Sequence, residues 1–222
     1  MNDIAHSSKL IARSFFLISR MQKIDTIVFD LGGVLIDWNP DYVFKKIFSA
    51  EEELQWFYKN ICTGDWNEEQ DAGRTIKEGT ELLLKQFPEH EKNIKIFYDS
   101  WVDMLGGPIH GTVNILRELK KKKYKTYALT NWSAETFPIA LDKYIFLHWF
   151  DGRHVSGEEK TRKPFKGFYE SLIKRFDINP AKSIYLDDNK RNLVPAKEMG
   201  FTTIHFQSPE QFRGELERMR VL

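Results

Sequence analysis

Short apolar runs alternate with longer amphipathic stretches along most of the chain. Four of these runs have the length and the content of β-branched and aromatic residues that are typical of buried strands, and they lie at 24–29, 124–129, 183–186 and 202–206. Helical spacing of apolar residues follows over 109–123, 134–143, 165–176, 190–199 and 208–219. Buried strands that alternate with helices predict an α/β fold, a Rossmann-like parallel sheet with helices on both faces.

A different pattern fills the segment from residue 39 to residue 107. Here apolar residues recur at helical spacing, near 43–48, 54–61, 82–87 and 94–105, and no strand pattern stands out. Asn39-Pro40 at one end and Gly106-Gly107-Pro108 at the other are typical of breaks between structural units. The pattern predicts an α-helical domain at 39–107, inserted into a core made of 21–38 and 108–222.

The first twenty residues fit neither pattern. Lys9 and Arg13 interrupt their apolar positions, so no run approaches the ~20 apolar residues of a membrane span. The unbroken apolar stretch and cleavage site of a signal peptide are not evident either. We therefore expect 1–20 to be a tail outside the folded domain, with an amphipathic targeting helix as the alternative.

Composition and charge exclude several classes of function. The 222 residues are enough for a substantial core, and 41% hydrophobic with 29% charged residues is usual for a globular protein. The 33 basic and 32 acidic residues give a net charge of +1, which offers no electrostatic case for nucleic acid or an anionic membrane. The single cysteine, Cys62, excludes an internal disulfide and a cysteine zinc site, predicts a buried structural thiol, and fits a cytoplasmic location.

Small polar or acidic residues follow three of the predicted strands directly. Asp30 ends the first run, Thr130 the second, and Asp187-Asp188 the third. In parallel sheets the ligand lies beyond the carboxyl ends of the strands. We therefore expect these side chains to meet at one edge of the sheet.

Four motifs at these positions resemble those of the haloacid dehalogenase-like (HAD) hydrolase superfamily. The first is Phe29-Asp30-Leu31-Gly32-Gly33-Val34-Leu35, and the others are Leu129-Thr130-Asn131, Arg162-Lys163-Pro164 and Leu186-Asp187-Asp188. They occur in the family's order over about 24–206, and the helical insert stands where many members carry a cap. The stretch Asp188-Asn189-Lys190-Arg191-Asn192, with Met199-Gly200 after it, is similar to the phosphatase branches.

The resemblance implies a nucleophile and a metal. Asp30 would attack phosphorus and form an aspartyl-phosphate, which splits the hydrolysis into two easier steps. Asp30, Asp188 and the backbone carbonyl of Gly32 would supply the oxygen ligands that Mg²⁺ prefers. Asp187 would either bind the metal as well or orient the other ligands.

The resemblance also implies residues that hold the phosphate. The Thr130 hydroxyl and the Asn131 backbone N–H would bind phosphoryl oxygens, and Lys163 would balance their charge. Asn192 would support the acidic loop from outside the ligand set. Taken singly, Thr130 could instead cap a helix and Lys163 could be a surface lysine that precedes a helix-starting proline.

One position departs from the usual phosphatase pattern. Most phosphatases of the superfamily have a second aspartate two residues after the nucleophile, where this chain has Gly32. Glycine cannot transfer a proton, and general acid–base catalysis typically contributes ~10²–10⁴ in rate. The Asp-Leu-Gly sequence is similar to a bacterial branch associated with sugar-phosphate phosphatases, such as those acting on glucose 1-phosphate. Water or a carboxylate such as Asp37 or Asp71 could supply the proton instead.

Two other functions compete with a Mg²⁺-dependent phosphatase. A 2-haloacid dehalogenase also lacks the second aspartate, but normally has an arginine soon after the nucleophile, and none occurs between Met21 and Gly73. A catalytically degenerate binding or regulatory protein would explain Gly32 alone. The retained Asp30 and Lys163 favour the phosphatase.

The polar stretch from Gly64 to Arg74 in the insert is the predicted specificity segment. Trp66 would pack against a sugar ring and Arg74 would bind a charged group, while the alternative is a turn between helices with Trp66 buried. Because a closed cap excludes large partners, the expected substrate is a small phosphorylated metabolite, with sugar phosphates favoured. The oligomeric state is not predicted.

Overall fold

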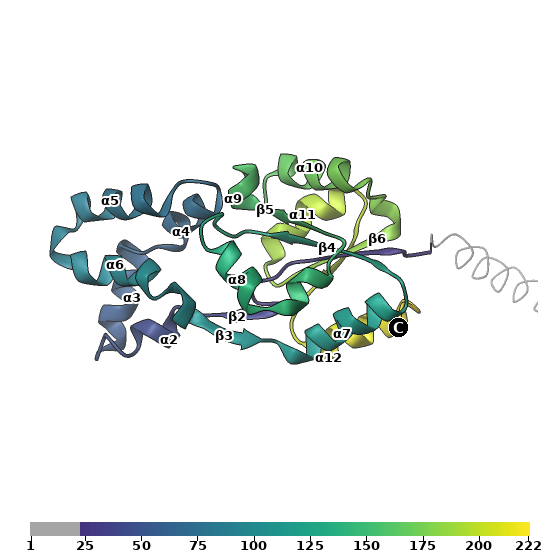
Figure 1. The fold of residues 1–222 in the computed structure, drawn as a ribbon, viewed down its shortest axis with the longest axis horizontal. Coiled ribbons are helices and arrows are strands. Elements are labelled where there is room, and N and C mark those ends of the chain that lie inside the picture. Colours follow the sequence, from purple (N-terminus) through teal and green to yellow (C-terminus); the bar gives the residue numbers. More distant parts are fainter. Residues whose placement is uncertain (1–22) are drawn as a thin grey trace, which may run out of the picture.

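The computed structural model describes residues 23–222, so the predicted tail at 1–20 lies outside the described residues. The described chain forms an α/β core and a helical cap, which a two-stranded ribbon joins (Figure 1). The predicted α/β fold, a parallel sheet with helices on both faces, is confirmed.

A five-stranded parallel sheet with the order β5-β4-β1-β6-β7 organises the core. Its strands are β1 (Thr26–Phe29), β4 (Lys125–Thr130), β5 (Gly152–Val155), β6 (Ser183–Asp187) and β7 (Thr202–His205). The central strand β1 is buried along its whole length, as its apolar sequence predicts for a strand covered on both faces. In register, Phe29 lies between Ala128 and Leu186.

Helices cover both faces of this sheet (Figure 1). Ile27 and Phe29 face a cluster that includes Leu116 and Phe212, whereas Val28 faces Phe168 on the other side. The first face carries α7 (His110–Lys121), α8 (Phe137–Lys143) and α12 (Pro209–Arg218), and the second carries α9 (Ser156–Glu159), α10 (Lys166–Phe176) and α11 (Lys190–Glu198). Short 3₁₀ helices lie at Ile145–Trp149 and Pro180–Lys182.

The insert is a helical unit with a core of its own. Phe44, Phe57 and Phe97 pack together there with the buried Cys62. Its helices are α2 (Asp41–Phe44), α3 (Glu51–Asn60), α4 (Gly64–Asp71), α5 (Ile76–Gln86) and α6 (Glu91–Asp99), with 3₁₀ helices at Pro88–His90 and Trp101–Met104.

Four elements were not among the sequence-based expectations. The antiparallel ribbon of β2 (Ile36–Trp38) and β3 (Leu105–Pro108), which joins cap and core, was not expected. Nor was β5, an edge strand whose sequence Gly-Arg-His-Val has no apolar run. Most of the predicted specificity segment, for which the alternative was a turn between helices, forms the helix α4, capped by the Thr63 side chain.

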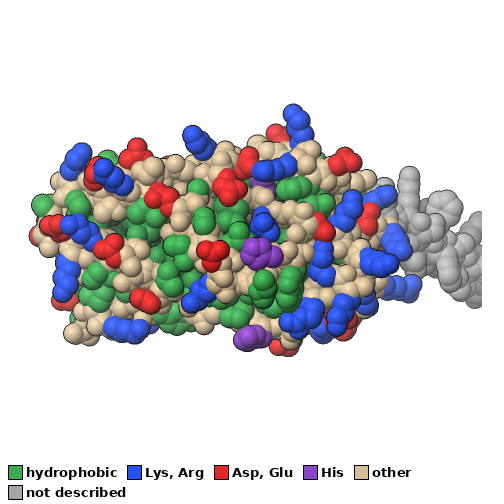
Figure 2. Space-filling view, in the orientation of Figure 1, with side chains coloured by type: hydrophobic (Ala, Val, Ile, Leu, Met, Phe, Trp, Pro, Cys, Tyr) green, Lys and Arg blue, Asp and Glu red, His purple; other side chains and the backbone are tan. Residues whose placement is uncertain are grey.

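Charged side chains of both signs occur along the face shown in Figure 2, and basic ones are more frequent at the end of the core that lies away from the cap. Apolar side chains surface between the cap and the core. Within residues 23–222, no helix combines the length and apolar character that crossing a bilayer requires.

Candidate active site

The fold brings the carboxyl ends of β1, β4 and β6 to one edge of the sheet. Asp30 follows β1, Thr130 ends β4, and Asp187 ends β6. The backbone N–H of Asp30 donates to the carbonyl of Leu186 at 3.0 Å, which ties the first and third strand ends together. Asp30 is 7% exposed and Asp187 is fully buried, so the site has a floor of carboxylates below the surface.

Three carboxylates crowd this floor. Asp30, Asp187 and Asp188 each offer an oxygen atom within 4.8 Å of the others. Burial, together with the negative charge of Asp187, holds the pKa of Asp30 well above its usual range, although Lys163 acts in the opposite direction. Such a group of like charges, with hard oxygen donors, fits a divalent cation such as Mg²⁺.

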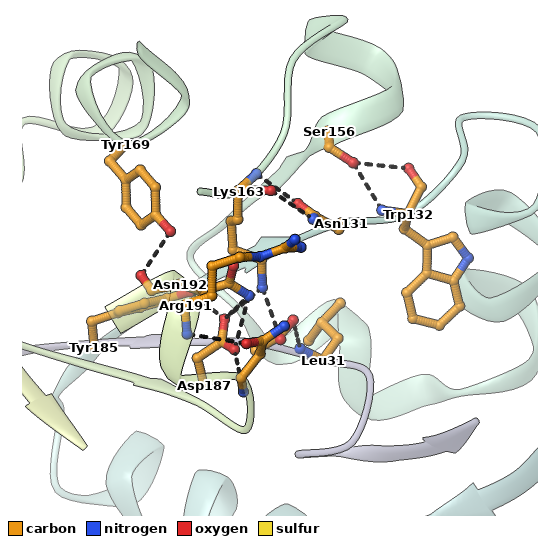
Figure 3. A network of polar contacts seen from close by, with 12 residues as sticks. Leu31, Asn131, Trp132, Ser156, Lys163, Tyr169, Tyr185, Asp187, Arg191 and Asn192 are labelled. Carbon is orange, nitrogen blue, oxygen red and sulfur yellow. Dashed lines mark hydrogen bonds and ion pairs between the residues drawn. The ribbon is translucent and has the colours of Figure 1, made fainter. Parts of the chain in front are cut away.

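Lys163 supplies one positive charge inside this cluster. Its side chain is 1% exposed, and its Nζ lies 2.8 Å from Oδ2 of Asp30 and 2.7 Å from Oδ2 of Asp187 (Figure 3). Burial by itself would raise the pKa of Asp187, but the charge of Lys163 and the hydrogen bonds from Lys163 and Tyr185 outweigh it and lower the pKa. The lysine is therefore a buried partner of the nucleophile position, not a surface residue.

Hydrogen bonds separate the roles of the two adjacent aspartates. The Asp187 carboxylate accepts from Lys163, from the Tyr185 hydroxyl, from the Asn189 backbone N–H at 2.8 Å, and from the Asn192 amide at 3.0 and 3.1 Å (Figure 3). Within residues 23–222, the Asp188 carboxylate accepts no hydrogen bond from another residue's side chain, and Asp188 is exposed to the cavity. Asp187 is thus saturated, whereas Asp188 has free lone pairs.

The end of β4 contributes an unpartnered hydroxyl, and the next residue, Asn131, makes two hydrogen bonds to the backbone of Lys163. The buried Thr130 hydroxyl has no hydrogen-bond partner in the described chain, so it could donate a hydrogen bond to a ligand oxygen. The Asn131 side chain accepts from the Lys163 N–H at 2.8 Å and donates to the Lys163 carbonyl at 3.1 Å. This paired contact fixes the backbone from which the buried lysine extends (Figure 3).

The two glycines after Asp30 differ in what they require. Gly33 has φ of +69°, and a Cβ there would lie 2.5 Å from Oδ2 of Asp188. Only glycine allows the chain to turn there with Asp188 so close. At Gly32 a Cβ would meet nothing within 4 Å, so the space beside this glycine is open.

A cavity of about 280 Å³ lies over these residues, between core and cap. Its floor includes Asp30, Gly32, Lys163 and Asp188, all predicted site residues. Asn67 and Glu68, from the predicted specificity segment, and Arg191, from the motif after Asp188, line it as well. Its walls also include residues that sequence reasoning did not single out for this site, namely Trp38, Tyr98, Trp101, Trp132 and Ser133. Most of them come from the cap or its ribbon, so only the packing of cap on core reveals them.

The structure does not bring Trp66 or Arg74 to this cavity. Trp66 is 8% exposed in the cap core, and its indole N–H donates to the Gly79 carbonyl at 2.9 Å. Arg74 donates to Gln70 at 2.6 Å and to the Trp66 carbonyl at 2.8 Å. Because α4 is a helix, its opposite face reaches the cavity. The Thr63 cap was the local signal for this helix.

Ion pairs hold α4 against the core. The Glu68 carboxylate lies 3.2 Å from Arg162 and also pairs with Arg191, and Glu69 lies 3.2 Å from Arg162. On the next cap segment, the Ile76 N–H donates to the Glu135 side chain at 2.7 Å. The cap is therefore seated over the strand ends, with the cavity beneath it.

Of the two carboxylates considered as proton donors, only one reaches the cavity. Asp37 lies on β2 and accepts a hydrogen bond from Tyr42, away from the cavity lining. Asp71, the last residue of α4, lines the same cavity as Asp30.

Comparison with known proteins places this arrangement among its relatives. The sequence profile of the haloacid dehalogenase-like hydrolases matches residues 24–200. The chain is 28% identical over 178 residues to the sesquiterpene phosphatase of Aspergillus oryzae, which covers 80% of this chain and 87% of the relative. It is 23% identical over 204 residues to the D-ribitol-5-phosphate phosphatase of Bacteroides thetaiotaomicron, covering 87% and 97%. A HAD family enzyme of the same bacterium, solved in complex with magnesium and inorganic phosphate, has a TM-score of 0.65 at 22% identity and covers 83% of this chain and 95% of that one.

Proposed function

The chain belongs to the haloacid dehalogenase-like hydrolases, and from this premise we propose that it is a Mg²⁺-dependent phosphatase of small organic phosphate monoesters. The observation that carries the proposal is the buried group of Asp30, Lys163 and Asp187 beside the free carboxylate of Asp188. The two phosphatase relatives, and the magnesium and phosphate bound to an enzyme of similar fold, support the same reaction class.

The residues of the site divide the reaction between them. Asp30 attacks phosphorus in line with the leaving oxygen, and an aspartyl-phosphate forms. Thr130, through its unpartnered hydroxyl, and the Asn131 backbone N–H hold phosphoryl oxygens, while Lys163 balances their charge. Water then hydrolyses the aspartyl-phosphate and frees Asp30.

Mg²⁺ fits the donor set of this edge of the sheet. Asp30, Asp188 and the Gly32 carbonyl would hold it, and the bound ion would neutralise charge on the phosphoryl oxygens. Asp187 would orient the site from outside the ligand set, because its lone pairs are already engaged by Lys163 and other donors. Asn192 donates to Asp187 and so supports the acidic loop, the role that the resemblance implied.

The cavity walls indicate the kind of organic group the substrate carries. Trp38, Tyr98, Trp101 and Trp132 present aromatic surface, on which the face of a sugar ring or an apolar carbon skeleton can pack. Polar side chains such as Asn67 and Arg191 lie beside these aromatic residues in the lining. Polar groups beside aromatic surface favour a substrate with hydroxyl oxygens, so sugar phosphates remain the preferred class over purely apolar phosphates.

Phosphate release from a panel of small monoesters, with Mg²⁺ and with a chelator, tests this function. We expect Mg²⁺-dependent turnover that Asp30→Asn lowers by at least ~10³-fold, because the nucleophile is lost. Asp25→Asn is the matched control, since Asp25 is exposed at the opposite end of the same strand. Release of halide from 2-haloacids without metal would identify a dehalogenase, and absence of turnover from every panel would identify a binding protein.

A further inference from the structure

Among residues 23–222, the floor of the site contains no side chain that is free to protonate the leaving group. Asp30 is the proposed nucleophile, and Lys163 and Asp187 form an ion pair with each other. Gly32 has no side chain, and the space beside it is open. A leaving alkoxide needs a proton, so the donor has to come from another wall of the cavity.

The cap places one carboxylic acid on that other wall. Asp71 lies three and four residues after Glu68 and Asn67, so the three side chains share the face of α4 that lines the cavity. The Asn67 amide makes a long 3.5 Å contact with Oδ2 of Asp71, and Asn67 itself accepts from the Tyr98 hydroxyl at 2.9 Å. The opposite face of the helix is fixed by the fully buried Gln70. Asp71 is thus held on a packed helix in the wall of the cavity that Asp30 also lines.

The surroundings of Asp71 suit a group that both gives and takes a proton. Burial and the neighbouring Glu68 raise the pKa of Asp71 to about 7, against the opposite effects of the Ser133 main chain, Arg162 and Lys163. Both protonation states of the carboxyl group are therefore populated near neutral pH, which is the condition for efficient general acid–base catalysis.

We propose that Asp71, supplied by the cap, is the general acid–base that replaces the missing aspartate at Gly32, an inference that rests on the proposed phosphatase function. In the first step the bond between phosphorus and the leaving oxygen breaks as the bond to Asp30 forms, and the proton of Asp71 goes to the leaving oxygen. In the second step the Asp71 carboxylate takes a proton from a water molecule, and the oxygen of that water attacks phosphorus. The bond between Asp30 and phosphorus breaks, which releases phosphate and regenerates the Asp30 carboxylate and the protonated Asp71.

This placement makes the chemistry depend on the seated cap. Glu68 and Glu69, which pair with core arginines, are on the same helix as Asp71. The contacts that close α4 over the strand ends are therefore the contacts that bring the proton donor into the cavity. An open cap would leave the nucleophile intact but without its donor.

The dependence of the rate on the leaving group tests the role of Asp71. For Asp71→Asn acting on an alkyl phosphate, we expect kcat/KM to fall ~10²–10⁴-fold, because the alkoxide is no longer protonated. For p-nitrophenyl phosphate we expect kcat/KM to fall less than ~10-fold, because that anion leaves without a proton. In the same variant, slow hydrolysis of the aspartyl-phosphate should produce a burst of p-nitrophenol. Asp65→Asn, an exposed aspartate on the same helix, should behave as the wild type with both substrates.

A purely structural role for Asp71 predicts a different result. Equal loss with both substrates, or no loss with either, would overturn the proposal. Asp71→Glu, which keeps the acid, should recover part of the alkyl phosphate rate, and Asp71→Ala provides a second variant if Asn does not fold. Retained turnover in Asp30→Asn would overturn the proposed phosphatase function. If Asp30→Asn is inactive but the loss of kcat/KM in Asp71→Asn does not depend on the leaving group, only the role of Asp71 is overturned.

Discussion

Gly32 and Gly33 are adjacent in this site, but they differ in backbone conformation and in the space available for a side chain. Gly33 needs a positive φ and leaves no room for a side chain beside Asp188, whereas Gly32 has neither restriction. Gly33 is therefore required by backbone geometry, while Gly32 matters for the side chain that is absent. The same distinction applies to Asp187 and Asp188, which differ in the hydrogen bonds already made and not in residue type.

Alanine substitutions separate these two glycines. We expect Gly33→Ala to lower the free energy of unfolding by roughly 1–2 kcal/mol, because a Cβ is strained at positive φ, and to weaken Mg²⁺ binding because Asp188 is displaced. Gly32→Ala should change the free energy of unfolding by no more than about 1 kcal/mol. Denaturant unfolding and Mg²⁺ titration measure both effects. Equal losses in the two variants would contradict the assignment.

At the scale of elements, the spacing of apolar residues predicted the buried strands and the long helices. The strands β1, β4 and β6 and the five long core helices lie close to their expected ranges, because their apolar periodicity reports burial directly. The edge strand β5 and the β2–β3 ribbon carry short, mixed sequences, and they are strands because neighbouring backbone pairs with them. The helix α4 was not predicted, because its apolar content is low, although Thr63 caps it.

The seating of α4 on the core is an electrostatic contact that a single substitution tests. Glu68→Gln removes charge from the pairs with Arg162 and Arg191, and we expect this to cost roughly 1 kcal/mol of local closure. Backbone amides of α4 should then exchange with solvent about fivefold faster, measured by hydrogen–deuterium exchange.

Two controls accompany this measurement. Glu52→Gln alters an exposed glutamate of α3 and should leave the exchange of α4 unchanged. High salt should reproduce part of the Glu68→Gln effect in the wild type, because screening weakens the same pairs. Unchanged exchange of α4 in Glu68→Gln would show that apolar packing alone seats the cap.

At the scale of the whole molecule, cap and core each have a hydrophobic core, and the site lies where they meet. The strand ends of the core carry Asp30, Thr130 and Asp188, the residues proposed as nucleophile, phosphate ligand and metal ligand. The cap supplies much of the wall and the carboxyl group of Asp71. This division means that the stability of the whole fold is linked to the protonation of a cap residue.

That linkage gives a pH dependence whose sign is determined by the raised pKa of Asp71. The unfolded carboxyl titrates near pH ~3.9 and the folded one at about 7, so from about pH 4 to 7 the folded state holds a proton that the unfolded state releases. The contribution of Asp71 to the free energy of unfolding therefore falls as pH rises through this range. Asp71→Asn lacks this loss, and its stability relative to wild type should increase by at most about 4 kcal/mol between pH 4 and 7.

Denaturant unfolding at several pH values measures this difference. Asp65→Asn should give a difference from wild type that does not change between pH 4 and 7, because Asp65 is exposed. A flat difference for Asp71→Asn as well would mean that the Asp71 carboxyl titrates in the ordinary aspartate range.

The sequence by itself determined the α/β class, the helical insert, and the residues of the catalytic floor. Those residues follow buried strands directly, and parallel strands bring their carboxyl ends to one edge, so position along the chain was enough to place Asp30, Thr130 and Asp187 together. Only the tertiary structure decided which aspartate keeps free lone pairs, that Trp66 faces the cap core, and that Asp71 lines the same cavity as Asp30. Those outcomes depend on hydrogen bonds and packing between segments distant in sequence, which periodicity and spacing do not report.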